Sequence, residues 1–553
     1  MSLTVNSGLS VPESGALKID STTTVQQMQG TIPISIAVGT AATEWIATSD
    51  QPWLVIQSAR GAFGVQPTWR IDPAAFNSFA NNQHYKARVR ITTNSSLEAR
   101  TFTLDAHKAL ASIKGLDSMA LIAGQSGDVL LYGSGFDALG SGVGALKVTG
   151  VEPVAVTRLN DKVLQVTLPT MAAGSYQVSL NAASGMATAA KPIHITTRNT
   201  YSYQTLDTEG RKGPMVWDGL SKSVFVVNKT LKSVMRYAPV AGQFQLIATR
   251  SFPFVDSIAM TPDRSALVLQ AGNSKVYKLS PADLSTLSVI DLAPNSAGRE
   301  TSLNVPLPIM GDNRLFSSYG WVDLDTGSIS PVLYAAQGHR FGSAEWGAVS
   351  GNGMRMVWPD SGRTSPSAPM LYTDLLSGTF KDYGVMTTTF FYQYAVNRAG
   401  TKWALNNQVV DFAMNILGKY TMPANWLSNQ GVFSRNGARL YHYAQSDARG
   451  VKPRIYVFDT SNALTTTVNF PVLGYIEFDD LPNCPYDSNK GYDSGCFTFN
   501  SHLTISDDDQ TIFIAGDKKF TVVPIPALML SPAPLRQGEA TVHARGLIKP
   551  AAN

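Results

Sequence analysis

The sequence predicts an all-β protein with several domains, and three observations carry this prediction. The chain has 553 residues, several times the size of an ordinary domain, so two to four hydrophobic cores are expected. Only 15% of the residues are charged, a balance that suits turn-rich β-structure. Short alternating runs broken by Gly, Asn, Asp and Pro recur throughout, whereas long helical periodicity is nearly absent. Such runs are typical of sandwiches and propellers.

Residues 1–108 are expected to form the first sandwich. Strand-like runs lie at 32–38, 53–57, 87–93 and 100–106. Trp45 and Trp53 flank a polar turn, and an alternating run follows at 85–93. This pattern resembles the BACON family of immunoglobulin-like sandwiches, and the resemblance implies either carbohydrate binding or a spacer role. We expect both tryptophans in the core, because large aromatic side chains dominate the cores of small sandwiches.

Residues 109–198 are expected to form a second sandwich. Gly-Gln-Ser-Gly-Asp-Val-Leu-Leu-Tyr-Gly-Ser-Gly-Phe at 124–136 is followed by strand-like runs at 163–169 and 174–180. These features resemble an IPT/TIG immunoglobulin-like domain, which implies a spacer or interaction module and a larger assembly formed through the sandwiches. Gly133 and Gly135 are explained by positive φ or by close approach of another backbone segment.

Residues 199–530 carry a degenerate repeat. Each copy is a short strand, a polar turn containing Asp, Asn or Gly, and an apolar strand; the copies lie at 216–225, 259–268, 308–316, 348–357, 395–403, 432–440 and 504–513. Most steps between copies are close to the roughly 40 to 50 residues of a four-stranded blade. The pattern resembles the YVTN/WD40-like bacterial propellers, although the Tyr-Val-Thr-Asn tetrad is absent. A β-propeller is therefore predicted, with seven blades favoured over six or eight.

Closure of the propeller requires the strand near 201–205 to pair with the last blade near 520–524, because an unpaired sheet edge is a liability. The segment 531–553 is then expected to lie outside the closed ring as a C-terminal tail. The spacing between the last two copies of the repeat is longer than the others, which predicts an insertion at 479–499, between the sixth and seventh blades.

That insertion contains the only two cysteines of the chain, Cys484 and Cys496. Their short, Gly-rich spacing predicts a disulfide, which favours an oxidising compartment; the alternative is two unpaired thiols in a cytoplasmic protein. Asp487, Asn489 and Asp493 offer oxygen ligands for Ca²⁺, but they do not follow the order of an EF-hand. A solvated acidic loop is favoured over a calcium site, and no other cofactor is predicted.

The charge pattern bears on which partners to expect. A net charge of +4 results from 44 basic and 40 acidic residues, without a Lys/Arg block that would neutralise phosphates, so no nucleic-acid partner is predicted. No apolar stretch is long enough to span a bilayer. Residues 1–30 lack a signal-peptide pattern, which suits either a mature secreted or periplasmic protein or a phage structural protein.

The mouth of the propeller channel, near the starts of the innermost strands, is the predicted ligand site, because loops from every blade converge there. The residues expected there are Asp256, Glu345, Trp346, Tyr392, Gln393, Asn429, Gln430 and His502. Trp346 and Tyr392 are suited to stacking on a sugar, and Glu345, Asn429 and His502 to bonding its hydroxyls. The alternative is that these side chains only fill and hydrate the channel.

No linear catalytic motif is present in a convincing context, so no enzyme is predicted. The favoured hypothesis is an adhesion or recognition protein that is extracellular, on the cell surface, periplasmic or virion-associated. Its propeller would be the head that binds a glycan or protein ligand, and its sandwiches the stalk. One alternative is a structural phage component without ligand binding. Another is a propeller enzyme of the lactonase or lyase type with a metal in its channel.

Overall fold

Strands dominate the structure, a computed structural model. It describes residues 8–37, 42–95, 98–117, 121–139, 145–186, 190–271, 275–292, 307–317, 320–330, 348–359, 369–378, 380–385, 394–405, 407–422, 426–446, 452–462, 468–477, 502–527, 541–543 and 548–549. Within these ranges, helical structure is limited to α1 (Pro73–Asn77), two short 3-10 helices at Val25–Gln27 and Phe136–Leu139, and Ala527. The all-β prediction is therefore confirmed.

The chain forms two compact units. The first contains Met1–Lys114, Leu131–Pro169 and Tyr176–Pro192, and the second contains Gly115–Leu130, Thr170–Ser175 and Ile193–Asn553. The later sheets therefore share one unit with a few segments that precede residue 199.

The first unit begins with two sheets that share a core. A five-stranded sheet has the order β2 (Ser14–Asp20), β10 (Arg100–Ala109), β9 (Gln83–Thr93), β5 (Glu44–Ser49) and β7 (Arg60–Ala62). A three-stranded sheet has the order β3 (Gln29–Thr31), β8 (Thr68–Ile71) and β6 (Leu54–Ile56), and β1 (Leu9–Ser10) pairs with β4 (Ser35–Ile36). Trp45 and Trp53 are buried in the shared core, as expected, and the Trp45 indole donates to the carbonyl of Val65 at 3.0 Å.

A buried cation closes the end of α1 in this unit. Asp72 caps the helix N-terminus by accepting from the Ala74 N–H at 3.0 Å, and Pro73 occupies the first helical position. Lys108 donates its ammonium protons to the carbonyls of Phe76, Asn77 and Phe79. The orphan carbonyls at the helix end are thereby satisfied.

Residues 109–198 form two four-stranded sheets. One has the order β11 (Ser112–Leu116), β13 (Gly127–Ser134), β16 (Val163–Leu168) and β15 (Ala155–Asn160). The other has the order β12 (Leu121–Ile122), β18 (Lys191–Thr196), β17 (Gly174–Leu180) and β14 (Leu146–Val148). A Cβ at Gly133 would lie 1.8 Å from the Ser112 carbonyl oxygen, and Gly135 has φ +75°, so both glycines have the predicted geometric reasons.

Beyond residue 198, the described residues of the second unit form seven consecutive sheets with antiparallel cores. Sheet 1 contains β20 (Lys212–Asp218), β21 (Ser223–Asn228), β22 (Ser233–Val240) and β23 (Gln243–Ser251). Sheet 2 contains β24 (Ser257–Met260), β25 (Leu267–Gln270), β26 (Lys275–Leu279) and β27 (Thr286–Asp291). Sheet 3 contains β28 (Arg314–Ser317), β29 (Gly320–Asp323) and β30 (Ile329–Ser330), and its first strand is reduced to the bridge Ile309–Leu315.

The remaining sheets follow the same plan. Sheet 4 contains β31 (Ala348–Val349), β32 (Arg355–Pro359), β33 (Pro369–Asp374) and β34 (Phe380–Val385). Sheet 5 contains β35 (Tyr394–Val396), β36 (Trp403–Leu405), β37 (Gln408–Val410) and β38 (Ile416–Lys419). Sheet 6 contains β39 (Trp426–Phe433), β40 (Arg439–Ser446), β41 (Arg454–Asp459) and β42 (Val472–Glu477), and sheet 7 contains β43 (His502–Ile505), β44 (Thr511–Ala515) and β45 (Lys519–Pro524).

The first strands of these sheets follow one another in space. Contacts link β31, β35, β39, β43, β20 and β24 in that order. Sheet 3 contacts the sheets on either side of it, through the bond from the Lys278 ammonium to the Leu324 carbonyl and the bond from the Gly311 N–H to the Gly353 carbonyl. The sheets therefore succeed one another around the unit in the order of the sequence.

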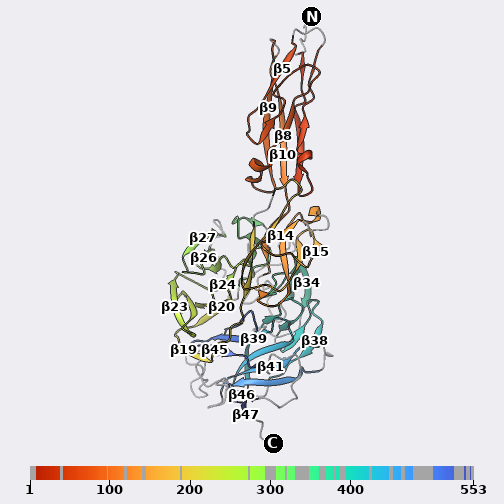
Figure 1. Cartoon of the computed structure of the whole chain (residues 1–553). Coiled ribbons are helices and arrows are strands. Elements are labelled where there is room, and N and C mark those ends of the chain that lie inside the picture. Colours follow the sequence, from red (N-terminus) through yellow and green to blue (C-terminus); the bar gives the residue numbers. More distant parts are fainter. Residues whose placement is uncertain are drawn as a thin grey trace. The chain divides into compact units, whose positions relative to one another are not determined.

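The predicted pairing between the start and the end of this region is present. β19 (Gln204–Asp207) pairs antiparallel with β45, with Gln204 opposite Val522, and the two strands lie side by side in Figure 1. Sheet 7 is thus completed by a strand that precedes sheet 1. The two sheets also share a core, in which the rings of Tyr237 and Phe520 stack at 4.2 Å.

Part of the segment 531–553 adds strands to the edge of sheet 6, which the sequence did not predict. β46 (Thr541–His543) pairs parallel with β42, and β47 (Ile548–Lys549) pairs antiparallel with β46. β42 is the last strand of sheet 6, so its outer edge presents backbone groups that an added strand satisfies.

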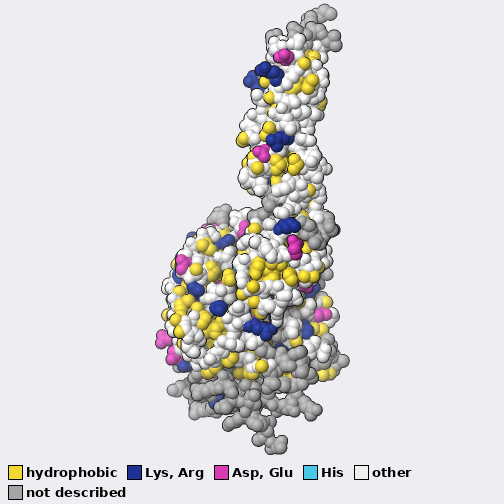
Figure 2. All heavy atoms as spheres, viewed as in Figure 1, with side chains coloured by type: hydrophobic (Ala, Val, Ile, Leu, Met, Phe, Trp, Pro, Cys, Tyr) yellow, Lys and Arg dark blue, Asp and Glu magenta, His cyan; other side chains and the backbone are white. Residues whose placement is uncertain are grey.

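The distribution of charged side chains on the surface agrees with the low content of charged residues in the sequence. On the face shown in Figure 2, Lys, Arg, Asp and Glu side chains of described residues are scattered among uncharged atoms. Among the described residues, no helix has the length and apolar character needed to cross a membrane.

Candidate functional site

Several of the predicted site residues lie outside the described residues. They are Glu345, Trp346, Tyr392 and Gln393 of the channel mouth, Asp487, Asn489 and Asp493 of the calcium alternative, and Cys484 and Cys496 of the disulfide. Asn429 belongs to β39, but its side chain is not described. Asp256, Gln430 and His502 are described, and they come from sheets 2, 6 and 7.

Gln430 and His502 meet at the start of β43. The Gln430 amide nitrogen lies 3.5 Å from His502 Nδ1, and its Oε1 accepts from the Leu503 N–H at 3.1 Å. The His502 ring also bonds the main chain of Lys212, the first residue of β20. These bonds tie the middle of β39 in sheet 6 to the starts of β43 in sheet 7 and β20 in sheet 1.

Asp256 joins this group from sheet 2. It directly precedes β24, and its Oδ1 pairs with the Lys229 ammonium at 3.2 Å, both side chains being largely buried. Asp256 Oδ2 is buried and makes no hydrogen bond. We call Lys212, Lys229, Asp256, Gln430 and His502 the strand-start cluster.

Burial and charge determine the protonation states in the strand-start cluster. Burial lowers the pKa of His502 to about 3, and the positive charges of Lys229 and Arg211 lower it further. Burial lowers the pKa of Lys212 to about 8, while its ammonium group donates to the carbonyls of Glu209 and Gly210. At pH 7 the His502 imidazole is therefore neutral and Lys212 is mainly an ammonium group. Together with the Gln430 amide and the Asp256–Lys229 ion pair, they form a set suited to hydrogen bonding with hydroxyl groups.

The opposite ends of the first strands carry a second group of polar residues, in a recurring turn. In six sheets the turn between the first two strands is closed by a hydrogen bond, which the N–H of the fourth turn residue donates to the carbonyl of the first. The first turn residues are Thr261, Met310, Ser350, Asn397, Ser434 and Ser506. The fourth residue has positive φ in each case, and Gly353, Gly400 and Gly437 meet this requirement without strain. In sheet 1 the carboxylate of Asp218 caps the corresponding turn by accepting from Ser221.

In sheets 2 and 7 the fourth turn residue is a charged residue rather than glycine. Arg264 of sheet 2 has φ +57° and is fully buried. Its guanidinium bonds Asp218 of sheet 1 and Asp507 of sheet 7, each at 2.9 Å. The second, Asp509 of sheet 7, has φ +59° and accepts the Arg435 N–H of sheet 6 at 2.9 Å. Burial raises the pKa of Asp509 to about 7, against the effect of that bond.

Arg398 extends this group to sheet 5. Its guanidinium pairs with the buried carboxylate of Asp117 and donates to the Asp128 carbonyl at 2.9 Å. We call Asp117, Asp218, Arg264, Arg398, Arg435, Asp507 and Asp509 the turn-side network. A buried network of this kind is costly to break, because removing one partner leaves another charge without compensation.

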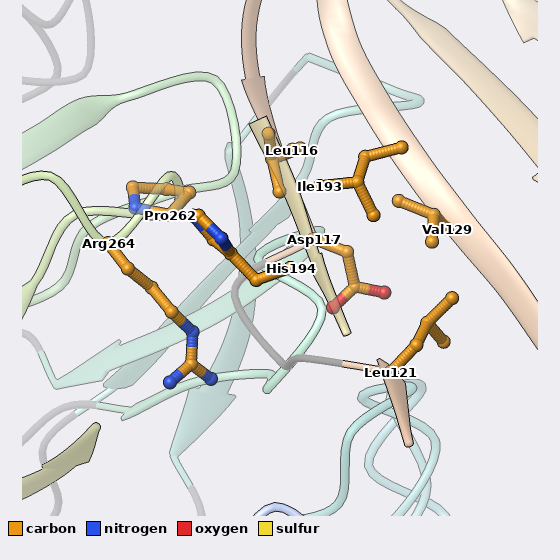
Figure 3. Close-up of a pocket in the computed structure, with 8 residues that line it drawn as sticks. All are labelled: Leu116, Asp117, Leu121, Val129, Ile193, His194, Pro262 and Arg264. Carbon is orange, nitrogen blue, oxygen red and sulfur yellow. The ribbon is translucent and has the colours of Figure 1, made fainter. Parts of the chain in front are cut away.

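Segments of the second unit that precede residue 199 lie against these turns. His194 of β18 bonds the Asp263 carbonyl through Nε2 at 3.1 Å, so Nε2 carries the proton. Burial lowers the pKa of His194, and the ring stays neutral at pH 7. Figure 3 shows His194 and Asp117 in a pocket with Arg264 to one side and Leu121 to the other. Its volume of about 10 Å³ is close to the minimum for one water molecule.

Sequence reasoning identified the turns but missed the turn-side network. The second position of the turn could have indicated this network, because it is occupied by charged residues in sheets 5 to 7: Arg398, Arg435 and Asp507. The corresponding residues in sheets 1 to 4 are Gly219, Pro262, Gly311 and Gly351. Charged side chains at this position are therefore not required by the turn itself.

Among the described residues, no group of three or more His, Cys, Asp or Glu side chains is arranged to hold a metal ion. No protein-family model matches this chain, and no curated protein matches it.

Proposed function

We propose that this chain is a binding protein whose seven later sheets form a seven-bladed β-propeller head, carried by two immunoglobulin-like modules of the BACON and IPT/TIG types. The sequential contacts of the first strands support a ring of blades. The β19–β45 pairing supports its closure, because it joins the two ends of the region as propeller closure requires. The two pairs of sheets before residue 199 support the sandwich modules.

The observation that carries the binding function is the strand-start cluster. Polar side chains from sheets 6, 7, 1 and 2 converge there, through Gln430, His502, Lys212, Lys229 and Asp256. A propeller binds ligands where loops of several blades meet. In the second unit, His194 and Asp117 lie against the turn-side ends of the strands. We therefore place the ligand at the strand-start end.

The ligand class that fits this cluster is a glycan. Sugar hydroxyls both donate and accept hydrogen bonds, so they suit the mixed donors and acceptors of this cluster. Gln430 is half-buried, and beside its bonds to His502 and Leu503 its amide has a second N–H and a second oxygen lone pair for a ligand. The proposal contains no catalytic step and places the protein outside the cytoplasm or on a virion, as the modular order of the sequence indicates.

A glycan array probed with the full chain tests this function, with and without Ca²⁺. We expect saturable binding to a restricted set of glycans, with Gln430→Ala weakening it on the order of tenfold because hydrogen bonds to the ligand are lost. The matched control is Gln245→Ala, since Gln245 is an exposed glutamine of β23.

Binding that is equal in Gln430→Ala and Gln245→Ala would place the ligand elsewhere. No binding to any glycan by the intact chain would remove the glycan as the ligand class and favour a structural role.

A further inference from the structure

The outer edge of sheet 6 differs from the outer edges of the neighbouring sheets. Sheets 1, 2, 4 and 5, as far as the structure describes them, end at their fourth strands, β23, β27, β34 and β38. Sheet 6 continues beyond its fourth strand, β42, through β46 and β47, which lie next to the C-terminus in Figure 1. Since the other sheets stop at four strands, the added strands depend on features particular to β42.

The stretch Tyr475–Glu477 of β42 is held in place by Arg454 of β41. The guanidinium carbon of Arg454 lies 4.0 Å from the centre of the Tyr475 ring, and its Nη2 and Nε bond Glu477 Oε2 at 2.8 and 2.9 Å. Leu473 and Ile476 of the same strand are buried in a core shared with sheet 7. The backbone of this edge is therefore ordered before a strand is added, which lowers the entropy cost of the addition.

The resident strand is held by a short ladder. In the described part of the chain, three residue pairs join β46 to β42 in parallel: Tyr475–Thr541, Ile476–Val542 and Glu477–His543. Parallel pairing is slightly less stable per residue than antiparallel pairing. The other strand that pairs with β46 is β47, which comes from the same C-terminal segment. The two strands are thus joined to sheet 6 through a ladder short enough to open.

The connection to β46 is long enough to reach a neighbouring molecule. Residues 525–540, sixteen in number, separate the end of β45 at Pro524 from the start of β46 at Thr541. A chain of this length can span roughly 50 Å, at about 3.3 Å per residue. A second copy offers the same strand to the same edge, so an exchange between two copies replaces each ladder with an identical one.

We propose that the edge Tyr475–Glu477 is a strand-acceptor site that takes β46 and β47 from a second copy of this chain. Two copies exchange these strands reciprocally, since each supplies one acceptor edge and one strand pair. The resident segment competes for the edge at an effective concentration on the order of 1 mM. Exchange therefore increases as the protein concentration approaches that range. Glycan binding at the strand-start cluster is independent of this edge.

Sedimentation equilibrium of the full chain, from about 10 µM to about 1 mM, tests the exchange. We expect a dimer fraction that rises with concentration. The double variant Thr541→Pro and Val542→Pro should stay monomeric over the same range. Consecutive N–H groups point to opposite sides of a strand, so these two prolines remove at least one that faces β42.

Glu98→Pro with Ala99→Pro is the matched control, because both residues are exposed and lie between β9 and β10 in the first unit. It should dimerise like the unaltered chain. A chain that stays monomeric across the whole range would overturn the proposal, and so would a dimer that persists in the Thr541→Pro and Val542→Pro variant. Both results are read on chains whose near-ultraviolet circular dichroism matches that of the unaltered protein.

A fluorescent peptide of residues 539–550 tests the acceptor edge directly, by anisotropy. It should bind the Thr541→Pro and Val542→Pro variant saturably, and the unaltered chain on the order of tenfold more weakly because the resident strand competes. Amide exchange at Tyr475–Glu477 should slow when the peptide is bound to the variant. Equal binding to both chains would place the peptide elsewhere, and no binding to either would mean that the edge does not accept this strand from another molecule; each result would contradict the proposal.

Discussion

At the scale of single residues, burial decides the chemistry of the second unit more than residue type does. Arg264 is fully buried, yet its charge is retained because Asp218 and Asp507 flank it. His442 is buried, only 1% exposed, and burial lowers its pKa to about 4. The flanking carboxylates thus keep Arg264 ionised, whereas burial favours the neutral form of His442.

His442 leads to a prediction on pH. Its Nδ1 lies 3.2 Å from the Tyr443 carbonyl, and its ring is neutral in the folded state. The unfolded histidine has a pKa near 6.5, above the folded value, so its contribution to stability is present above pH 6.5 and is lost as the pH falls toward 4. The loss is on the order of 3 kcal/mol.

We expect the midpoint temperature of unfolding of the second unit to decrease as the pH is lowered from 6.5 to 4. The decrease should be smaller in His442→Phe. His502 should account for part of the remaining slope, because its pKa is lowered in the same direction. His84→Phe is the control, since His84 is exposed in the first unit. An unchanged slope in His442→Phe would contradict this account.

At the scale of elements, the first turns connect neighbouring sheets through closely packed backbones. A Cβ at Gly353 would lie 2.6 Å from the Cα of Gly311 in the preceding sheet, and one at Gly437 would lie 2.6 Å from the Asn397 side chain. The turn glycines therefore meet two demands, positive φ and close approach. The sequence pattern revealed the turns, but only the structure reveals these two demands.

Gly353→Ala separates these two demands when it is compared with Gly378→Ala. Gly378 also has positive φ, +64°, but a Cβ there would meet nothing within 4 Å. We expect Gly378→Ala to lower the free energy of unfolding by about 1 kcal/mol through strain alone. Gly353→Ala should cost about 1 to 3 kcal/mol more, because backbone must move. Chemical denaturation followed by tryptophan fluorescence measures both, and equal losses would show that the contact is unimportant.

At the scale of the whole second unit, the shared core of sheets 1 and 7 is the feature that joins distant parts of the chain. Phe520 of β45 stacks on Tyr237 of β22 and lies in one cluster with Phe244 and Phe513. Residues at opposite ends of the region 204–524 are thus buried against each other. Such contacts make the unfolding of the first and last sheets interdependent.

Phe520→Ala tests this coupling by hydrogen exchange. Truncation of a buried phenylalanine costs about 3 to 5 kcal/mol. We expect faster amide exchange in β20–β23 as well as in β43–β45, because both sheets lose the same core contact. Phe102→Ala, in the core of the first unit, is the control and should leave these amides unchanged. Faster exchange confined to β43–β45 would mean that sheet 7 opens independently.

Much of the fold was predictable from the sequence, because it depends on local pattern. The alternation of apolar and polar residues indicated strands, and the recurring polar turn indicated seven sheets whose first turns lie where the repeats are. The tryptophans at 45 and 53 and the glycines at 133 and 135 follow from burial and from backbone geometry. In each case the physical cause acts within a few residues or on one face of a strand.

What only the tertiary structure decided is which polar groups meet. Arg264, Asp218 and Asp507 are far apart in the chain, and no local pattern pairs them; the same holds for Arg398 and Asp117. The pairing of β46 with β42 was also missed, since an open sheet edge accepts a strand through backbone groups that every sequence carries. The sequence by itself determined the strands and turns, whereas ion pairs, buried protonation states and edge pairing depend on distances that arise only when the sheets assemble.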